Sequence, residues 1–75
     1  MKIHPRDLTR LLALEPHGMH VALLPSDRAD EPATLLWTAT TAADVYAEIQ
    51  RRRGTAVADR CVIRPIGDVL REAGR

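Results

Sequence analysis

The residues of this sequence that are most capable of chemistry are its one cysteine, Cys61, and the histidines His17 and His20. Imidazole and thiolate groups are common zinc ligands, and a cysteine beside a histidine base can act as a nucleophile. However, His17 lies in a Pro-His-Gly turn and His20 on an expected strand, so their spacing fixes no ligand geometry. Cys61 begins the apolar run Cys-Val-Ile, where a free cysteine usually packs as a small hydrophobic residue. We therefore predict neither a metal site nor a catalytic cysteine.

Pairs of carboxylates recur at helical spacing, Asp44 with Glu48 and Asp68 with Glu72. Such pairs can perform general acid–base catalysis, but both are expected on solvent-facing helix surfaces, where charged residues need no catalytic role. The sequence has no GxGxxG, GxxxxGK[ST] or HExxH motif. A chain of 75 residues can also hardly enclose the pocket of roughly 300 Å³ or more that ligands usually occupy. We therefore predict no enzyme, no cofactor and no small-molecule substrate.

The most basic run of the sequence consists of Arg51, Arg52 and Arg53. Such a run could bind nucleic-acid phosphates. Consecutive helical residues are ~100° apart, so these side chains spread around the helix, and cations near a helix C-terminus also interact favourably with its dipole. The net charge of +1 and the pI of about 8.0 lie below the values typical of DNA-binding domains. The structural role is favoured, with these arginines kept as possible nucleic-acid contacts.

Apolar periodicity and turn residues divide the chain into the elements that must position these side chains. Helices are predicted over 5–15, 42–53 and 67–73, and strands over 19–24, 34–39 and 60–64. The helix over 42–53 has the clearest signals, because Thr41 is a favourable N-cap and Gly54 follows the last turn. A polar loop over 25–32, bounded by prolines, joins two strands that we expect to pair as a hairpin.

The order α-β-β-α-β-α predicts one domain over 1–75, a small two-layer α+β sandwich in which helices pack on one face of a three-stranded sheet. A chain this short buries only ~60% of its unfolded surface, so association with a second chain would be a route to stability. The sequence shows neither a signal peptide nor an apolar run of about 20 residues. We therefore expect a cytoplasmic protein without membrane contacts.

Period-two alternation assigns the strand side chains to two faces of the sheet. The expected core face contains Met19, Val21, Leu23, Leu35, Trp37, Cys61 and Ile63. The second face combines an apolar centre with a polar rim that contains arginines, which is the usual anatomy of a protein interface. Its predicted partner-binding residues are His20, Ala22, Leu36, Thr38, Arg60, Val62 and Arg64. The alternative is that the C-terminal helix covers this face.

Two classes of function fit these observations. The leading hypothesis is a small non-enzymatic protein-interaction module: an adaptor, a subunit, or a stoichiometric inhibitor or regulator of a larger assembly, a class that includes phage- and plasmid-encoded proteins. Its partner would be another protein or a second copy of the chain. The alternative is a nucleic-acid-binding regulator that uses arginine–phosphate contacts. Sheets that read single-stranded RNA stack bases on exposed aromatic residues, and this chain has only one Trp and one Tyr.

Overall fold

The computed structural model describes residues 2–73 as four helices and a three-stranded antiparallel sheet. The elements are α1 (Pro5–Leu14), the 3-10 turn η1 (Glu15–His17), β1 (His20–Leu24), β2 (Thr34–Ala39), α2 (Ala42–Arg53), α3 (Thr55–Arg60), β3 (Val62–Pro65) and α4 (Ile66–Ala73). The strand order is β2-β1-β3, so β1 is central. The predicted α+β class and element order are confirmed. None of the helices within residues 2–73 is both long and apolar enough to cross a membrane.

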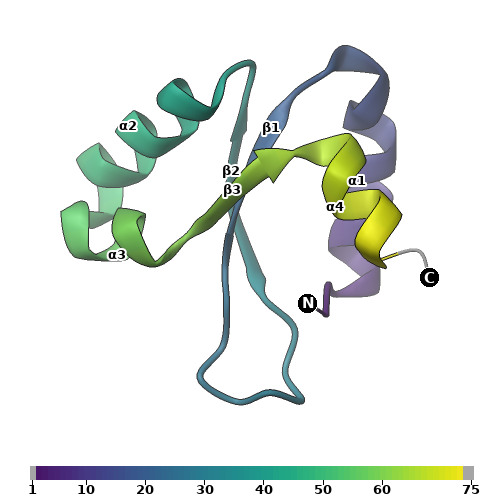
Figure 1. Ribbon diagram of the computed structural model, residues 1–75, viewed down its shortest axis with the longest axis horizontal. Coiled ribbons are helices and arrows are strands. Elements are labelled where there is room, and N and C mark those ends of the chain that lie inside the picture. The colour runs from purple at the N-terminus through teal and green to yellow at the C-terminus, as the bar shows by residue number, and fades with distance from the viewer. Residues whose placement is uncertain (1, 74–75) are drawn as a thin grey trace.

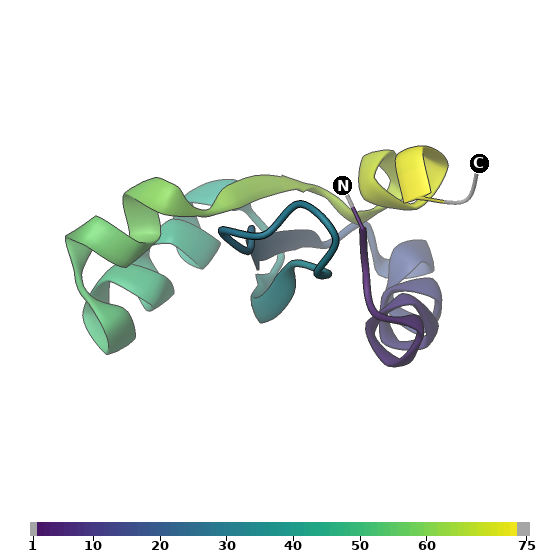
Figure 2. The ribbon, with the colours of Figure 1, turned by 90° about the horizontal axis from the view of Figure 1, so that it is seen from below.

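The helices lie in two pairs on either side of the sheet, with α2 and α3 on one side and α1 and α4 on the other (Figures 1 and 2). Ala22 packs in a cluster with residues of α2 and α3, whereas its neighbours Val21 and Leu23 pack with residues of α1 and α4. Because consecutive strand side chains point to opposite faces, the helices cover both faces of the sheet. This arrangement differs from the expected packing of helices on one face.

Local sequence explains where the two longer helices begin and where α2 ends. Pro5 occupies the first turn of α1, where its missing N–H is not needed, and the Nδ1 atom of His4 accepts a hydrogen bond from the Arg6 N–H at 3.1 Å. The Oγ1 atom of Thr41 accepts a hydrogen bond from the Asp44 N–H at 3.1 Å, which confirms the predicted N-cap of α2. Gly54 ends α2 with φ of 92°, a conformation that favours glycine.

Replacing Thr41 with alanine should lower the free energy of unfolding by about 1 kcal/mol, because the Asp44 N–H loses its acceptor at the start of α2. Urea denaturation followed by far-UV circular dichroism measures this change. Thr40→Ala is the matched control, since Thr40 is the preceding exposed residue and lies outside the helix. Equal denaturation midpoints for the two variants would contradict the capping role.

The sequence reasoning missed α3. Gly54 ends α2 as predicted, but a second short helix follows it at once, and β3 therefore begins at Val62 instead of residue 60. Burial of Ala58 at 2% exposure holds α3 against α2. Two hydrogen bonds also join these helices: the Tyr46 hydroxyl donates to Asp59 Oδ1 at 2.5 Å, and Gln50 Nε2 donates to Thr55 Oγ1 at 3.0 Å.

The pairing of β1 with β2 contains an irregularity that changes the faces of the β2 side chains. Ala22 pairs with Trp37, and the next residue of β1, Leu23, pairs with Leu35, so that β2 has one extra residue at Leu36. Leu35 packs on the side of α1 and α4, whereas Leu36 and Trp37 both pack on the side of α2. This is the effect expected of a β-bulge, which interrupts the alternation of side chains.

Candidate protein-binding site

The predicted interface residues do not form one face of the sheet. Ala22, expected near the interface centre, is 0% exposed and packs under α2 and α3, and Leu36 is half-buried on the same side. The reason is the strand register, in which Ala22 pairs with Trp37 and Ile63. These three side chains share a face, whereas the prediction placed Ala22 on the face opposite to the other two. The predicted interface centre is therefore wrong at Ala22.

Three other predicted interface residues, His20, Arg60 and Thr38, come from three different elements. His20 begins β1, where its Nδ1 atom lies 3.1 Å from the Thr40 carbonyl oxygen. Arg60 ends α3 instead of lying in a strand, and it forms an ion pair with Asp27 of the hairpin loop at 3.6 Å. Thr38 lies on β2 at one edge of the sheet and pairs with Val21 of β1.

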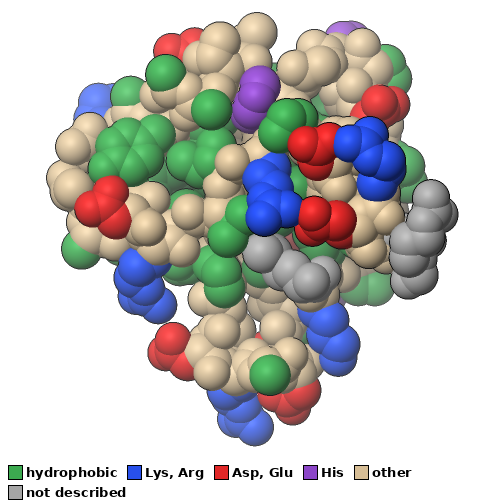
Figure 3. Space-filling model, viewed as in Figure 1, with side chains coloured by type: hydrophobic (Ala, Val, Ile, Leu, Met, Phe, Trp, Pro, Cys, Tyr) green, Lys and Arg blue, Asp and Glu red, His purple; other side chains and the backbone are tan. Residues whose placement is uncertain are grey.

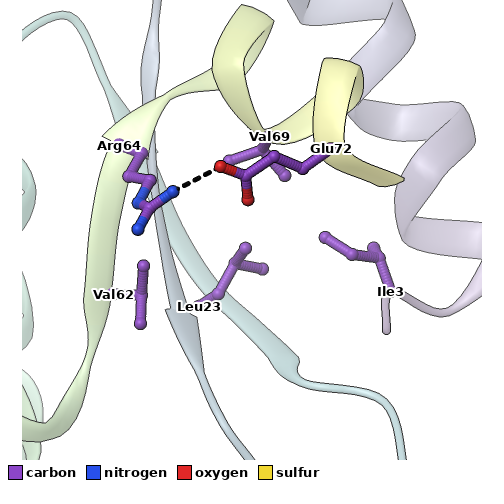
Figure 4. Close-up of a pocket in the computed structure, with 6 residues that line it drawn as sticks. All are labelled: Ile3, Leu23, Val62, Arg64, Val69 and Glu72. Atoms are coloured by element: carbon purple, nitrogen blue, oxygen red, sulfur yellow. Dashed lines mark hydrogen bonds and ion pairs between the residues drawn. The ribbon is translucent and has the colours of Figure 1, made fainter. Parts of the chain in front are cut away.

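Val62 and Arg64 are the predicted residues that the structure does bring together. With Ile3, Leu23, Val69 and Glu72 they line a hollow of about 220 Å³ between β3, α4 and the N-terminal segment (Figure 4). The floor is apolar, and Arg64 Nη1 donates to Glu72 Oε2 at 2.6 Å. Side chains of both charges gather over α4 and the adjoining part of β3 (Figure 3). Because the ion pair satisfies Arg64 within the chain, this arginine does not offer an unpaired charge to a partner.

Two of the three arginines at the end of α2 are also engaged within the chain. Arg51 and Arg52 both donate to Glu48, and the Arg52 guanidinium lies 4.4 Å from the centroid of the Trp37 ring. The hydrogen bond from Arg52, aided by the charge of Arg51, lowers the pKa of the Glu48 carboxyl group. These contacts are consistent with the structural role that the sequence favours.

Cys61 is half-buried on the side of the sheet that faces α2. Burial raises the pKa of its thiol group, and the nearby charges of Arg53 and Arg60 oppose this effect only in part. The neutral thiol is therefore the dominant form at neutral pH. Among residues 2–73, no three histidine, cysteine, aspartate or glutamate side chains gather in a way that could hold a metal ion.

The sequence reasoning overlooked the outer edge of β2. The Ile66 N–H donates to the Met19 carbonyl oxygen at 2.9 Å, and Ile66 directly follows β3. The carbonyl group of Met19, the residue before β1, therefore points towards the β3 side of the sheet. Backbone groups alternate in direction along an antiparallel strand. The odd-numbered residues of β1 therefore bond to β3, and the even-numbered residues bond to β2.

This alternation places backbone groups of β2 on the outside of the sheet. Leu35 and Thr38 pair with Leu23 and Val21, which are residues of β1 that bond to β3. The N–H and C=O groups of Leu35 and Thr38 consequently point away from β1. The backbone groups of Ala33 also point away from β1, and its N–H donates to the Lys2 carbonyl oxygen at 2.9 Å. The N-terminal segment thus covers the start of this edge and does not cover the part from Leu35 to Thr38.

The outer edge of β3 differs from that of β2. By the same alternation, Ile63 and Pro65 point their backbone groups away from β1. Pro65 has no N–H to donate, and β3 is only four residues long. Short strands and prolines are common devices that prevent an edge from pairing with another chain. The six-residue strand β2, with the sequence TLLWTA, contains neither a proline nor a charged residue.

Two adjoining hollows follow the outer edge of β2 and share Arg10 of α1. One has a volume of about 300 Å³ and is lined by His4, Arg6, Asp7, Arg10, Pro32, Ala33 and Thr34. The other has a volume of about 230 Å³ and is lined by Arg10, Leu35, Leu36, Trp37 and Thr38. We call these two hollows together the β2 groove. One wall comes from α1, and the other from β2.

The charged wall of the β2 groove is net positive. Arg6 and Arg10 are four residues apart on α1, so they lie on the same side of the helix, and both are exposed. In the part of the chain that the structure describes, the ion pairs involve neither of these arginines. The sequence shows both the spacing of Arg6 and Arg10 and the absence of charge in the strand over 34–39. It does not show that these arginines lie beside that strand, which depends on the tertiary fold.

Comparisons with protein-family models, with curated proteins and with solved structures find no match to this chain.

Proposed function

We propose that this chain is a small non-enzymatic protein-interaction module that binds a partner protein along the β2 groove. The observation that carries the proposal is the outer edge of β2 from Leu35 to Thr38, where outward-pointing backbone groups lie beside a hollow of about 230 Å³. An extended segment of a partner can add to such an edge through main-chain hydrogen bonds while pockets select its side chains. The chain would act as an adaptor, a subunit, or an inhibitor or regulator of a larger assembly.

The apolar residues of the groove support a protein partner. Leu35, Leu36 and Trp37 are each half-buried, so they already contact the core and still present apolar surface to a ligand. Burying apolar surface contributes about 25 cal/mol per Å², and aromatic residues are enriched where binding energy concentrates. A module of this kind needs no buried reactive group, because it acts by occupying or bridging surfaces.

The alternative of a nucleic-acid-binding regulator has less support. Arg51, Arg52, Arg60 and Arg64 each form an ion pair with a carboxylate of the chain. Phosphate binding would have to compete with these contacts. One face of the Trp37 ring is also occupied by Arg52, which reduces the aromatic surface on which a base could stack.

A pair of variants at one position tests the proposal. Thr38→Pro removes an N–H that points away from β1, whereas Thr38→Val keeps this N–H and has a similar shape. Partner proteins captured from the host with the parent chain should be retained by Thr38→Val. Thr38→Pro should weaken their binding at least about tenfold, a change of ~1.4 kcal/mol. Circular dichroism establishes first that both variants are folded.

Amide exchange of the isotope-labelled chain then locates the contact. With a captured and purified partner, the backbone N–H groups of Leu35 and Thr38 should become protected from exchange. Unchanged binding by Thr38→Pro would refute the proposal. So would protection confined to the residues around the hollow that Val62, Arg64 and Glu72 line.

A further inference from the structure

We infer that the segment bound in the β2 groove is extended and acidic, with carboxylate groups that pair with Arg10 and Arg6 of α1. This inference rests on the proposed function and specifies the chemistry of the partner at the same site. It follows from the backbone of β2, from the charge of the α1 wall and from the apolar side chains that line the groove.

The chain itself demonstrates the extended geometry. Ile3 forms a parallel bridge with Ala33, the residue before β2, and the Lys2 carbonyl oxygen accepts a hydrogen bond from the Ala33 N–H at 2.9 Å. The chain then turns into α1 at Pro5 and leaves the edge beyond Ala33. A bound segment would lie farther along the same edge, where Leu35 and Thr38 offer N–H and C=O groups.

The bulge limits which segments can bind. Leu35 and Thr38 are three residues apart because of the extra residue at Leu36, whereas outward-pointing residues of a regular strand are two apart. A long, flat strand therefore cannot continue a regular ladder along β2, and bulges are one means by which edges avoid unselective pairing. The site suits a short segment held at two backbone positions.

The charge of the wall selects acidic side chains. Arg10 lines both hollows, Arg6 lines the one nearer the N-terminal segment, and Asp7 is the one carboxylate among the lining residues. Guanidinium groups can bind carboxylates through two parallel hydrogen bonds, which are stronger than hydrogen bonds between neutral groups. A segment rich in lysine would be repelled by the same wall. The half-buried Leu36 and Trp37 favour apolar residues between the acidic ones.

Two short capped peptides provide the test, one alternating glutamate with valine and the other alternating lysine with valine. Trp37 is the only tryptophan and lines the groove, so its fluorescence reports binding directly. We expect the glutamate peptide to bind at low salt and the lysine peptide to bind at least about tenfold more weakly. Arg10→Gln should weaken binding of the glutamate peptide about tenfold, and Thr38→Pro should weaken it similarly. The matched control is Arg28→Gln, because Arg28 lies on the exposed hairpin loop outside the groove.

Several results would overturn the inference. These are equal binding of the two peptides, no binding of either peptide, and binding of the glutamate peptide that Arg10→Gln leaves unchanged. Tighter, Arg10-dependent binding of a short oligothymidylate would assign the groove to single-stranded nucleic acid. A parent chain that is dimeric by light scattering, with a monomeric Thr38→Pro variant, would assign the groove to a second copy.

The two proposals can fail separately. Partner binding that depends on the Thr38 N–H, without binding of the glutamate peptide, would retain the proposed function and reject the acidic segment. Partner binding that Thr38→Pro leaves intact would reject the proposed function and the acidic partner segment together, even if the glutamate peptide binds.

Discussion

Replacing Ala22 with aspartate should leave the chain largely unfolded. Ala22 is 0% exposed, at the centre of β1, and packs with Val45, Ile49 and Ala58 of the covering helices. An aspartate there would bury a carboxyl group with no hydrogen-bonding partner and would press its larger side chain into packed neighbours. Such substitutions cost on the order of 4 kcal/mol or more, which approaches the ~5 kcal/mol at the lower end of stability for natural domains.

Far-UV circular dichroism and urea denaturation measure this effect, with Thr34→Asp as the control. Thr34 is exposed on the neighbouring strand β2, so the same charge in a strand should change the free energy of unfolding by only ~0.5 kcal/mol. If Ala22→Asp unfolds at the same urea concentration as Thr34→Asp, then Ala22 lies on an exposed face. That result would restore the interface expected from side-chain alternation and contradict the register of the sheet.

Local signals were sufficient to predict most of the secondary structure. The helix over 42–53 begins and ends at the predicted residues, because Thr41 caps it and Gly54 adopts a positive φ after its last turn. The strand over 34–39 also has the predicted bounds, since β-branched, aromatic and apolar residues occur there between turn residues. Both predictions depend on interactions within a few residues, and such interactions are present in the sequence itself.

The faces of the sheet could not be predicted in the same way. Alternation separates the side chains of one strand into two sets, but it does not say which set shares a face with which set of the next strand. On β1 both sets are apolar, with Val21 and Leu23 on one face and Ala22 on the other. Hydrophobicity therefore could not decide which set of β1 shares a face with which set of β2. The extra residue at Leu36 then reversed the alternation within β2.

The candidate site was inaccessible to sequence reasoning for a related reason. The β2 groove depends on β2 being an edge strand, which the strand order β2-β1-β3 gives, and on the packing that places α1 beside it. Arg10 and Trp37 are far apart in the sequence and line one hollow because the chain returns along the sheet between them. Val62 and Arg64 were placed together by the prediction because they are two residues apart on one strand.

Gly54→Ala should lower the free energy of unfolding by about 1–3 kcal/mol, because Gly54 has φ of 92° and ψ of 162°, a conformation that residues with a Cβ atom strongly disfavour. No atom lies within 4 Å of a Cβ built there, so the loss would come from backbone strain and not from a steric clash. This strain would act at the junction where α3 folds back on α2, and the Tyr46–Asp59 hydrogen bond should weaken with it.

The control for this prediction is Gly67→Ala in the first turn of α4, where a new Cβ would meet its nearest atoms at 3.8 Å, an ordinary contact. This change should be neutral or should stabilise the chain by up to ~1 kcal/mol, because alanine favours the helix and reduces the entropy of the unfolded chain. The urea concentration at the midpoint of unfolding should therefore fall for Gly54→Ala. For Gly67→Ala it should stay the same or rise. If Gly54→Ala is as stable as the parent chain, α2 must continue past residue 54, and α3 would not exist as a separate helix.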